Sequence, residues 1–142
     1  MKKYTELELK NILEKHFLWL AEDPNGVEAD LRGADLTDLD LSWYNFYGID
    51  LRGADFYGAN LSNANLSRTD LSGAILYGAD LSEANLKGAD LRGASLIGAD
   101  LSKASLNEAD LRGVDFRGTN LRGANLCGVY PREAEILIET VV

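Results

Sequence analysis

The chain has 142 residues, of which 46% are hydrophobic and 26% are charged, and its formal net charge is −9. This length suits one domain, and the acidic balance argues against direct electrostatic binding of nucleic acid. The single cysteine, Cys127, excludes an internal disulfide. Together with the lack of an apolar run long enough for a membrane span, it favours a cytoplasmic location.

The first segment, residues 1–28, predicts an amphipathic helix over residues 5–22. Thr5 and Glu8 have the spacing of a capping box, in which each side chain accepts a hydrogen bond from the backbone of the other. The sequence Asp-Pro-Asn-Gly at residues 23–26 then ends the helix. Apolar residues recur at helical intervals and would form its buried face: Leu9, Ile12, Leu13, Phe17 and Leu20.

Residues 29–128 repeat every five residues without an insertion, in twenty pentads of the form Ala-Asp-Leu-x-Gly. The central residue is Leu or Phe in all twenty, the residue two before it is Ala in fourteen, and the residue two after it is Gly in thirteen. A core that accepts so few side-chain types at fixed spacing is typical of a solenoid. The glycine that ends thirteen of the pentads suits a turn with positive φ.

A second period, of twenty residues, indicates that four pentads make one coil. Residues twenty apart share their character, so they are expected to stack, and twenty pentads then give about five coils. Three outward columns show this most clearly: Arg32, Arg52, Ser72, Arg92 and Arg112; Ser42, Ser62, Ser82, Ser102 and Arg122; and Asn45, Asn65, Asn85, Ser105 and Asn125.

These pentads resemble the pentapeptide-repeat family, whose general pattern is Ala-Asp/Asn-Leu-x-x, over about 70% of the chain. The resemblance implies an all-β solenoid, a right-handed quadrilateral β-helix in which each pentad forms one side of a square. The central and Ala side chains would point inward. Because dimers of this family commonly meet through their C-terminal ends, the resemblance also implies a possible homodimer at that end.

The two ends of such a solenoid need covering, because each exposes apolar side chains and unpaired backbone groups. We expect the N-terminal helix to cap the first coil, where Leu39, Tyr44 and Ile49 replace Ala beside Trp43 and Tyr47. A partner-binding aromatic patch and simple decay of the repeat are the alternatives at this coil.

The last segment, residues 129–142, is predicted to cap the other end or to pair with a second copy. It keeps some register of the repeat, and its β-branched residues favour a strand. The residues proposed for this role are Ile136, Leu137, Ile138 and Val141.

No constellation of residues in the sequence suits catalysis, a metal or a cofactor, so the protein is not expected to be an enzyme. His16 has no second His or Cys to complete a metal site, and it falls on the apolar face of the helix. The stacked Asp column lacks the spacing of a calcium loop and runs beside an Arg column. Cys127 is expected to be an inert surface thiol, because no local base accompanies it.

The function expected from the sequence is therefore a rigid scaffold for protein–protein interaction, whose partner the sequence does not identify. The candidate contact is an exposed apolar strip formed by Tyr57, Ile75, Tyr77 and Ile97. The alternative is mimicry of duplex DNA toward gyrase or topoisomerase, as in the quinolone-resistance members of the family. This chain lacks their inserted loops, and its Arg column weakens the negative field that a mimic needs.

Overall fold

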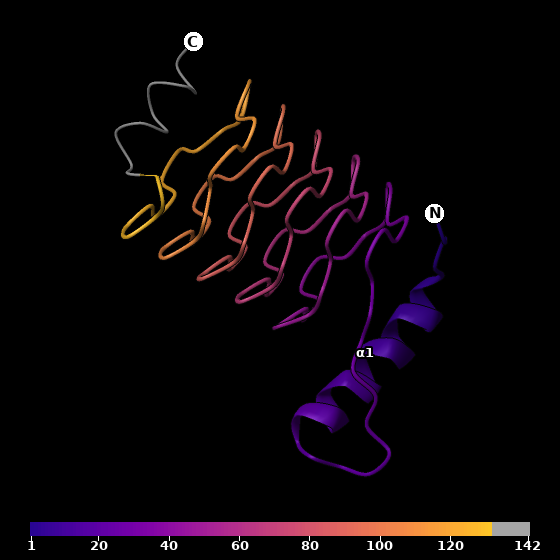
Figure 1. Ribbon diagram of the computed structural model, residues 1–142. Coiled ribbons are helices and arrows are strands. Elements are labelled where there is room, and N and C mark those ends of the chain that lie inside the picture. The colour runs from indigo at the N-terminus through magenta and orange to yellow at the C-terminus, as the bar shows by residue number, and fades with distance from the viewer. Residues whose placement is uncertain (132–142) are drawn as a thin grey trace.

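The computed structural model of the protein describes residues 1–131. One helix, α1 (Glu6–Leu20), is followed by a tube of stacked coils, with α1 at the end formed by the first coil (Figure 1). The predictions for Ile136, Leu137, Ile138 and Val141 lie outside the described residues.

Each pentad forms a tight turn followed by a single pairing residue. In the first pentad the Ala34 amide donates to the Leu31 carbonyl at 3.1 Å, and Gly33 in the turn has φ 62°. A positive φ at the third residue of a four-residue turn is the pattern of type II, which favours glycine. The same position has positive φ in all twenty pentads, including seven that do not carry glycine: Asp38, Trp43, Asn63, Arg68, Glu83, Lys103 and Glu108.

The coils pair through parallel β-bridges between residues twenty apart, such as Asp30 with Asp50. The Leu31 amide donates to the Asp50 carbonyl at 3.1 Å, and the Asp55 amide donates back to the Ala34 carbonyl at 2.9 Å. Four pentads per coil are therefore observed directly. Each of these bridges is a single, isolated residue pair. The sequence predicted an all-β solenoid, but residues 1–131 contain no extended strand or sheet. The reason is that each turn uses four residues of the five.

We number the four faces of the tube by their central residues. Face 1 has Leu31, Leu51, Leu71, Leu91 and Leu111; face 2 has Leu36, Phe56, Leu76, Leu96 and Phe116; face 3 has Leu41, Leu61, Leu81, Leu101 and Leu121; and face 4 has Phe46, Leu66, Leu86, Leu106 and Leu126.

The core of the tube consists of the central and Ala side chains, as the repeat predicts. Leu31, Phe46 and Leu81 are completely buried, and Ala84 likewise has no exposed area. Leu121, in the last described coil, is the one central residue that is only half-buried. Most of the remaining positions of each pentad face outward, so they form the side surfaces that a partner can contact.

Helix α1 begins with the predicted capping box. The Glu8 amide donates to Thr5 Oγ1 at 3.2 Å, and the Thr5 amide donates to Glu8 Oε2 at 2.8 Å. Leu9 is completely buried and Leu13 nearly so, and both join the same apolar cluster as the tube. Leu20 was predicted on the buried face but is 43% exposed, because it lies in the last turn of the helix, beyond the residues that pack on the coil.

Two features before the first pentad were not apparent in the sequence. Lys3 forms a parallel bridge with Asp35, and the Asp35 amide donates to the Lys2 carbonyl at 2.8 Å, so the N-terminus pairs with face 2 of the first coil. Gly26, the one glycine outside the repeat, packs against α1. A Cβ there would lie 2.1 Å from the Trp19 nitrogen, so only glycine fits.

Candidate protein-contact surface

The strip predicted on face 2 is exposed at three of its four residues. Tyr57 is 50% exposed, Tyr77 44% and Ile75 41%, whereas Ile97 is half-buried. The rings of Tyr57 and Tyr77 stack with centroids 5.4 Å apart and planes 8° from parallel. Cross-coil stacking of this kind stabilises the ladder. The same rings still present a large exposed apolar area, which would suit a contact.

The corners on both sides of this strip carry no side chains. Gly53 and Gly73 lie at the corner toward face 1, and Gly58 and Gly78 lie at the corner toward face 3. A Cβ at Gly53, Gly73 or Gly78 would meet nothing within 4 Å, so these corners are open to solvent. The two tyrosines are therefore not flanked by side chains from the corner residues of their own coils.

The Asp/Asn position of the repeat has a structural task that the sequence analysis missed. At this position the side-chain Oδ1 accepts a hydrogen bond from the amide two residues later, for example from Arg32 to Asp30 at 3.1 Å. The neutral amide does the same, since the Ser62 amide donates to Asn60 Oδ1 at 3.0 Å. Interchange of Asp and Asn at one position of the repeat was the signal for this role. Many of the acidic residues of the chain therefore stabilise the turns of the repeat.

On face 1 the carboxylates are also paired with arginines. Arg32 Nη2 lies 2.5 Å from Asp30 Oδ2, and Arg52 Nη2 lies 2.6 Å from Asp50 Oδ2. Hydrogen bonds from the Arg32 side chain and amide lower the pKa of Asp30 to about 2. The Arg column therefore offsets the repulsion between the stacked carboxylates of face 1.

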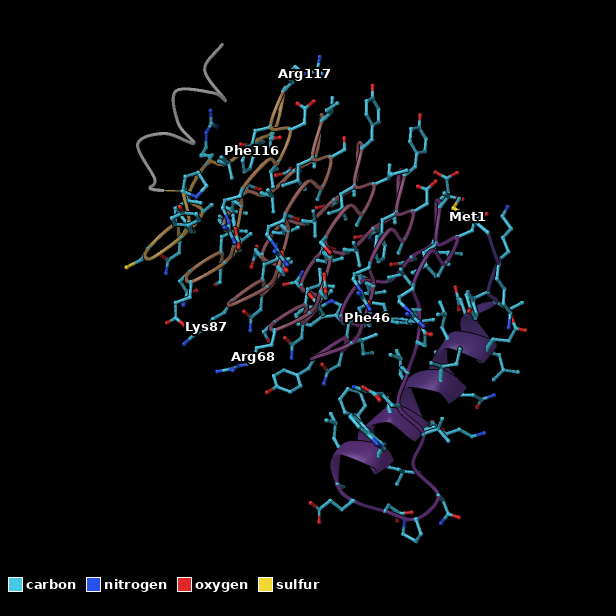
Figure 2. The ribbon with its side chains drawn as sticks, in the orientation of Figure 1. Met1, Phe46, Arg68, Lys87, Phe116 and Arg117 are labelled. Carbon is cyan, nitrogen blue, oxygen red and sulfur yellow. The ribbon has the colours of Figure 1, made fainter. Side chains whose placement is uncertain are left out.

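The charge of the tube differs from face to face. Face 1 carries five Asp against four Arg, and face 3 carries three Asp and one Glu against one Lys and one Arg. Face 2 carries four Asp against one Arg, so it is the most acidic face. Face 4 has no Asp and carries Arg68 and Lys87 against Glu108. Figure 2 shows Arg117 of face 2 on the opposite side of the tube from Arg68 and Lys87.

His16 links α1 to the first coil. The side chain is 1% exposed, its Nδ1 accepts the Ala29 amide at 3.1 Å, and its Nε2 lies 3.3 Å from the Tyr47 carbonyl. Because Nδ1 accepts a hydrogen bond, the ring proton lies on Nε2 and is donated to Tyr47. Both nitrogens are thus used by the backbone, so His16 joins the helix to the residues around the first coil.

The aromatic residues of the first coil divide between the core and the surface. Tyr44 packs against the apolar cluster, and burial raises the pKa of its hydroxyl. It also lines a groove of about 310 Å³ together with Leu13 and Phe17 of α1. Trp43 is 76% exposed in a left-handed backbone conformation. The contacts of Tyr44 agree with the expectation that α1 packs on this coil. Trp43 is not among the residues that line the groove or pack against the apolar cluster.

The remaining candidates from the sequence contribute no further site within residues 1–131. Cys127 is an exposed free thiol on face 4. No three His, Cys, Asp or Glu side chains of the described residues come together as a metal site would require. In the same part of the chain, no helix has both the length and the apolar character needed to cross a bilayer.

A family profile and solved structures of known proteins both match this chain, and both belong to the pentapeptide repeats. The profile of the pentapeptide repeats matches eight copies, over residues 27–53, 54–93 and 94–130. A pentapeptide repeat protein from the Arabidopsis thaliana thylakoid lumen is 36% identical, with 71% of this chain and 74% of that one covered and a TM-score of 0.45. Among curated proteins, no relative matches significantly.

Two further solved structures are similar to this chain. The pentapeptide repeat protein Rfr23 from the cyanobacterium Cyanothece 51142 is 29% identical, with 85% of this chain and 93% of that one covered and a TM-score of 0.44. QnrB1, a plasmid-mediated fluoroquinolone resistance protein, is 20% identical, with 80% and 69% covered and a TM-score of 0.38.

Proposed function

Because this chain belongs to the pentapeptide repeat family and has its quadrilateral β-helix, we propose that it is a non-enzymatic scaffold for another protein. The contact is the strip of Tyr57, Ile75, Tyr77 and Ile97 on face 2. The observation that supports this proposal most is the exposure of three large apolar side chains, Tyr57, Ile75 and Tyr77, together on one face of the tube. A cytoplasmic location and the absence of catalysis are parts of the same proposal.

A comparison of variants in a pull-down tests the strip. The double variant Tyr57→Ser with Tyr77→Ser should lose a partner that the wild type retains. Both positions tolerate serine, because Ser42 and Ser62 occupy the equivalent place on face 3. Tyr47→Ser, which removes a 38% exposed tyrosine from face 4, is the matched control and should keep the partner. If the double variant retains every partner, the strip is not the contact.

The ends of the tube complete this proposal. We propose that residues 1–28 cap a tube of five coils through α1, which buries Leu9 completely and Leu13 nearly so. Removal of residues 1–20 should then cause binding of an apolar dye that the full chain does not bind. At the other end Leu121 and Ala124 are only half-buried, which favours a cap or a homodimer formed by residues 129–142. Light scattering with and without residues 129–142 distinguishes the dimer from the cap.

DNA mimicry toward gyrase or topoisomerase is the alternative, and it has weaker support. A duplex carries negative charge along its whole surface. In this tube face 1 is nearly neutral, and face 4 carries Arg68 and Lys87. A supercoiling assay at micromolar protein should therefore show no change in gyrase activity, and inhibition or protection would favour mimicry instead.

A further inference from the structure

We infer that the strip on face 2 takes a basic segment of a polypeptide, in which arginine or lysine alternates with apolar residues. This inference rests on the proposed function and specifies the chemistry of the partner. It follows from the carboxylates close to Tyr57, from the stacking of its ring on Tyr77, and from the lack of side chains at the glycine corners.

Two carboxylates lie close to Tyr57. Asp55 is fixed by the Tyr57 amide, which donates to its Oδ1 at 2.9 Å. Asp38 is in the preceding coil, where its amide donates to the Tyr57 carbonyl at 2.9 Å, and its carboxylate lies directly over Gly58. Tyr57 thus has one carboxylate on face 2 itself, from Asp55, and a second at the corner toward face 3, from Asp38.

These carboxylates differ from most others on the tube, because no basic side chain within residues 1–131 forms an ion pair with either. On face 1 each Asp has an Arg nitrogen within 3.6 Å, and on face 2 itself Asp115 is paired with Arg117 at 2.6 Å. The negative charge around the tyrosines is therefore available to a partner, whereas the charge on face 1 is already neutralised.

The aromatic stack leaves one face of each ring for a ligand. Tyr57 and Tyr77 cover each other on one side, and the equivalent positions in the coils before and after them hold the smaller Thr37 and Ile97. A guanidinium over Tyr57 would gain a cation–π contact and the attraction of Asp38 and Asp55. An apolar residue next to it would contact Ile75 and Tyr77.

The glycine corners decide how closely the partner can approach. Because Gly53, Gly73 and Gly78 have open space around them, a partner backbone can lie across face 2, and the corner side chain that it meets is Asp38, whose carboxylate lies over Gly58. Face 3 offers no such access, since its corner carries Trp43, Asn63, Glu83 and Lys103. Charge complementarity and access thus point to the same face.

The test uses the full chain and three fluorescein-labelled decapeptides that alternate leucine with arginine, serine or glutamate. We expect the arginine peptide to bind and to shift the amide resonances of residues 55–58 and 75–78. Its Kd should rise at least about 5-fold when salt is raised from 50 to 300 mM. A similar loss is expected in Asp38→Asn with Asp55→Asn, which keeps the acceptor at position 55 because Asn60 serves in the same way.

A matched control separates local from overall charge. Asp80→Asn with Asp100→Asn removes the same charge from face 3, where Asp80 and Asp100 accept only from their neighbouring serines and from Asn120, and it should leave the Kd unchanged. Equal losses in the two double variants would overturn the inference.

The outcomes also separate this inference from the proposed function. If the serine or glutamate peptide binds the strip as well as the arginine peptide, the strip is a contact surface but its partner is not basic. If none of the three peptides shifts the strip resonances and the pull-down with Tyr57→Ser and Tyr77→Ser also shows no loss, both proposals fail.

Discussion

The glycine corners provide the sharpest test of the fold, because a substitution there changes the cost of the backbone conformation without adding a steric clash. At Gly73 φ is 66°, and an added Cβ would meet nothing within 4 Å, so Gly73→Ala introduces no clash. The left-handed conformation costs a non-glycine residue about 1–2 kcal/mol. Alanine returns about 0.5–1 kcal/mol of this by restricting the unfolded chain. Gly73→Ala should therefore lower the unfolding free energy by about 1 kcal/mol.

The reverse substitution has the opposite sign. Glu83 occupies the same kind of corner with φ 58°, so Glu83→Gly removes the conformational cost and should stabilise the fold by about 0.5–1 kcal/mol. Calorimetry and urea unfolding followed by circular dichroism measure both variants, with shifts in Tm of about 3 °C in opposite directions. A neutral Gly73→Ala, or a destabilising Glu83→Gly, would refute the view that backbone conformation selects glycine at these corners.

Three further predictions concern the core, the helix junction and acid. Leu81→Ala should cost about 2–5 kcal/mol by leaving a cavity, and Ala84→Leu about 1–3 kcal/mol by overpacking, so a Tm equal to wild type would contradict either. His16→Phe should cost about 2–4 kcal/mol in urea unfolding, because two buried backbone groups lose their partner. Stability should fall in an acid titration as the pH drops from about 4 to about 2. Asp30, whose pKa is lowered to about 2 by Arg32, contributes fully above its unfolded pKa of about 3.9 and loses this contribution as the pH falls toward 2, so constant stability over that window would contradict this.

The sequence was sufficient to predict the interior of the tube, because its physical requirements repeat. Leu81 and Ala84 are buried as the pentad predicts, and the column of period twenty matches the bridge from Asp30 to Asp50. The capping box of Thr5 could be predicted for a similar reason, since it depends on local spacing alone.

Features that depend on a single long-range contact could not be predicted. The bridge between Lys3 and Asp35 joins an N-terminus without any repeat pattern to the first coil, so no period indicates it. The exposure of Leu20 depends on where α1 ends relative to the coil. The pairing of Asp30 with Arg32 is different, because it is a local contact: the arginine stands two residues after the carboxylate, where Asp55 is followed by Tyr57.

The proposed contact surface lies where the repeat departs from its own rule. At most positions like Asp55, an Asp or Asn side chain accepts a hydrogen bond from the amide two residues later. At position 75 the chain instead has isoleucine, which has no acceptor for the Tyr77 amide and is 41% exposed. A substitution that gives up a stabilising hydrogen bond and exposes an apolar side chain does not serve folding. It does enlarge the apolar area beside the Tyr57–Tyr77 stack, which is the result expected if this face is used to bind a partner.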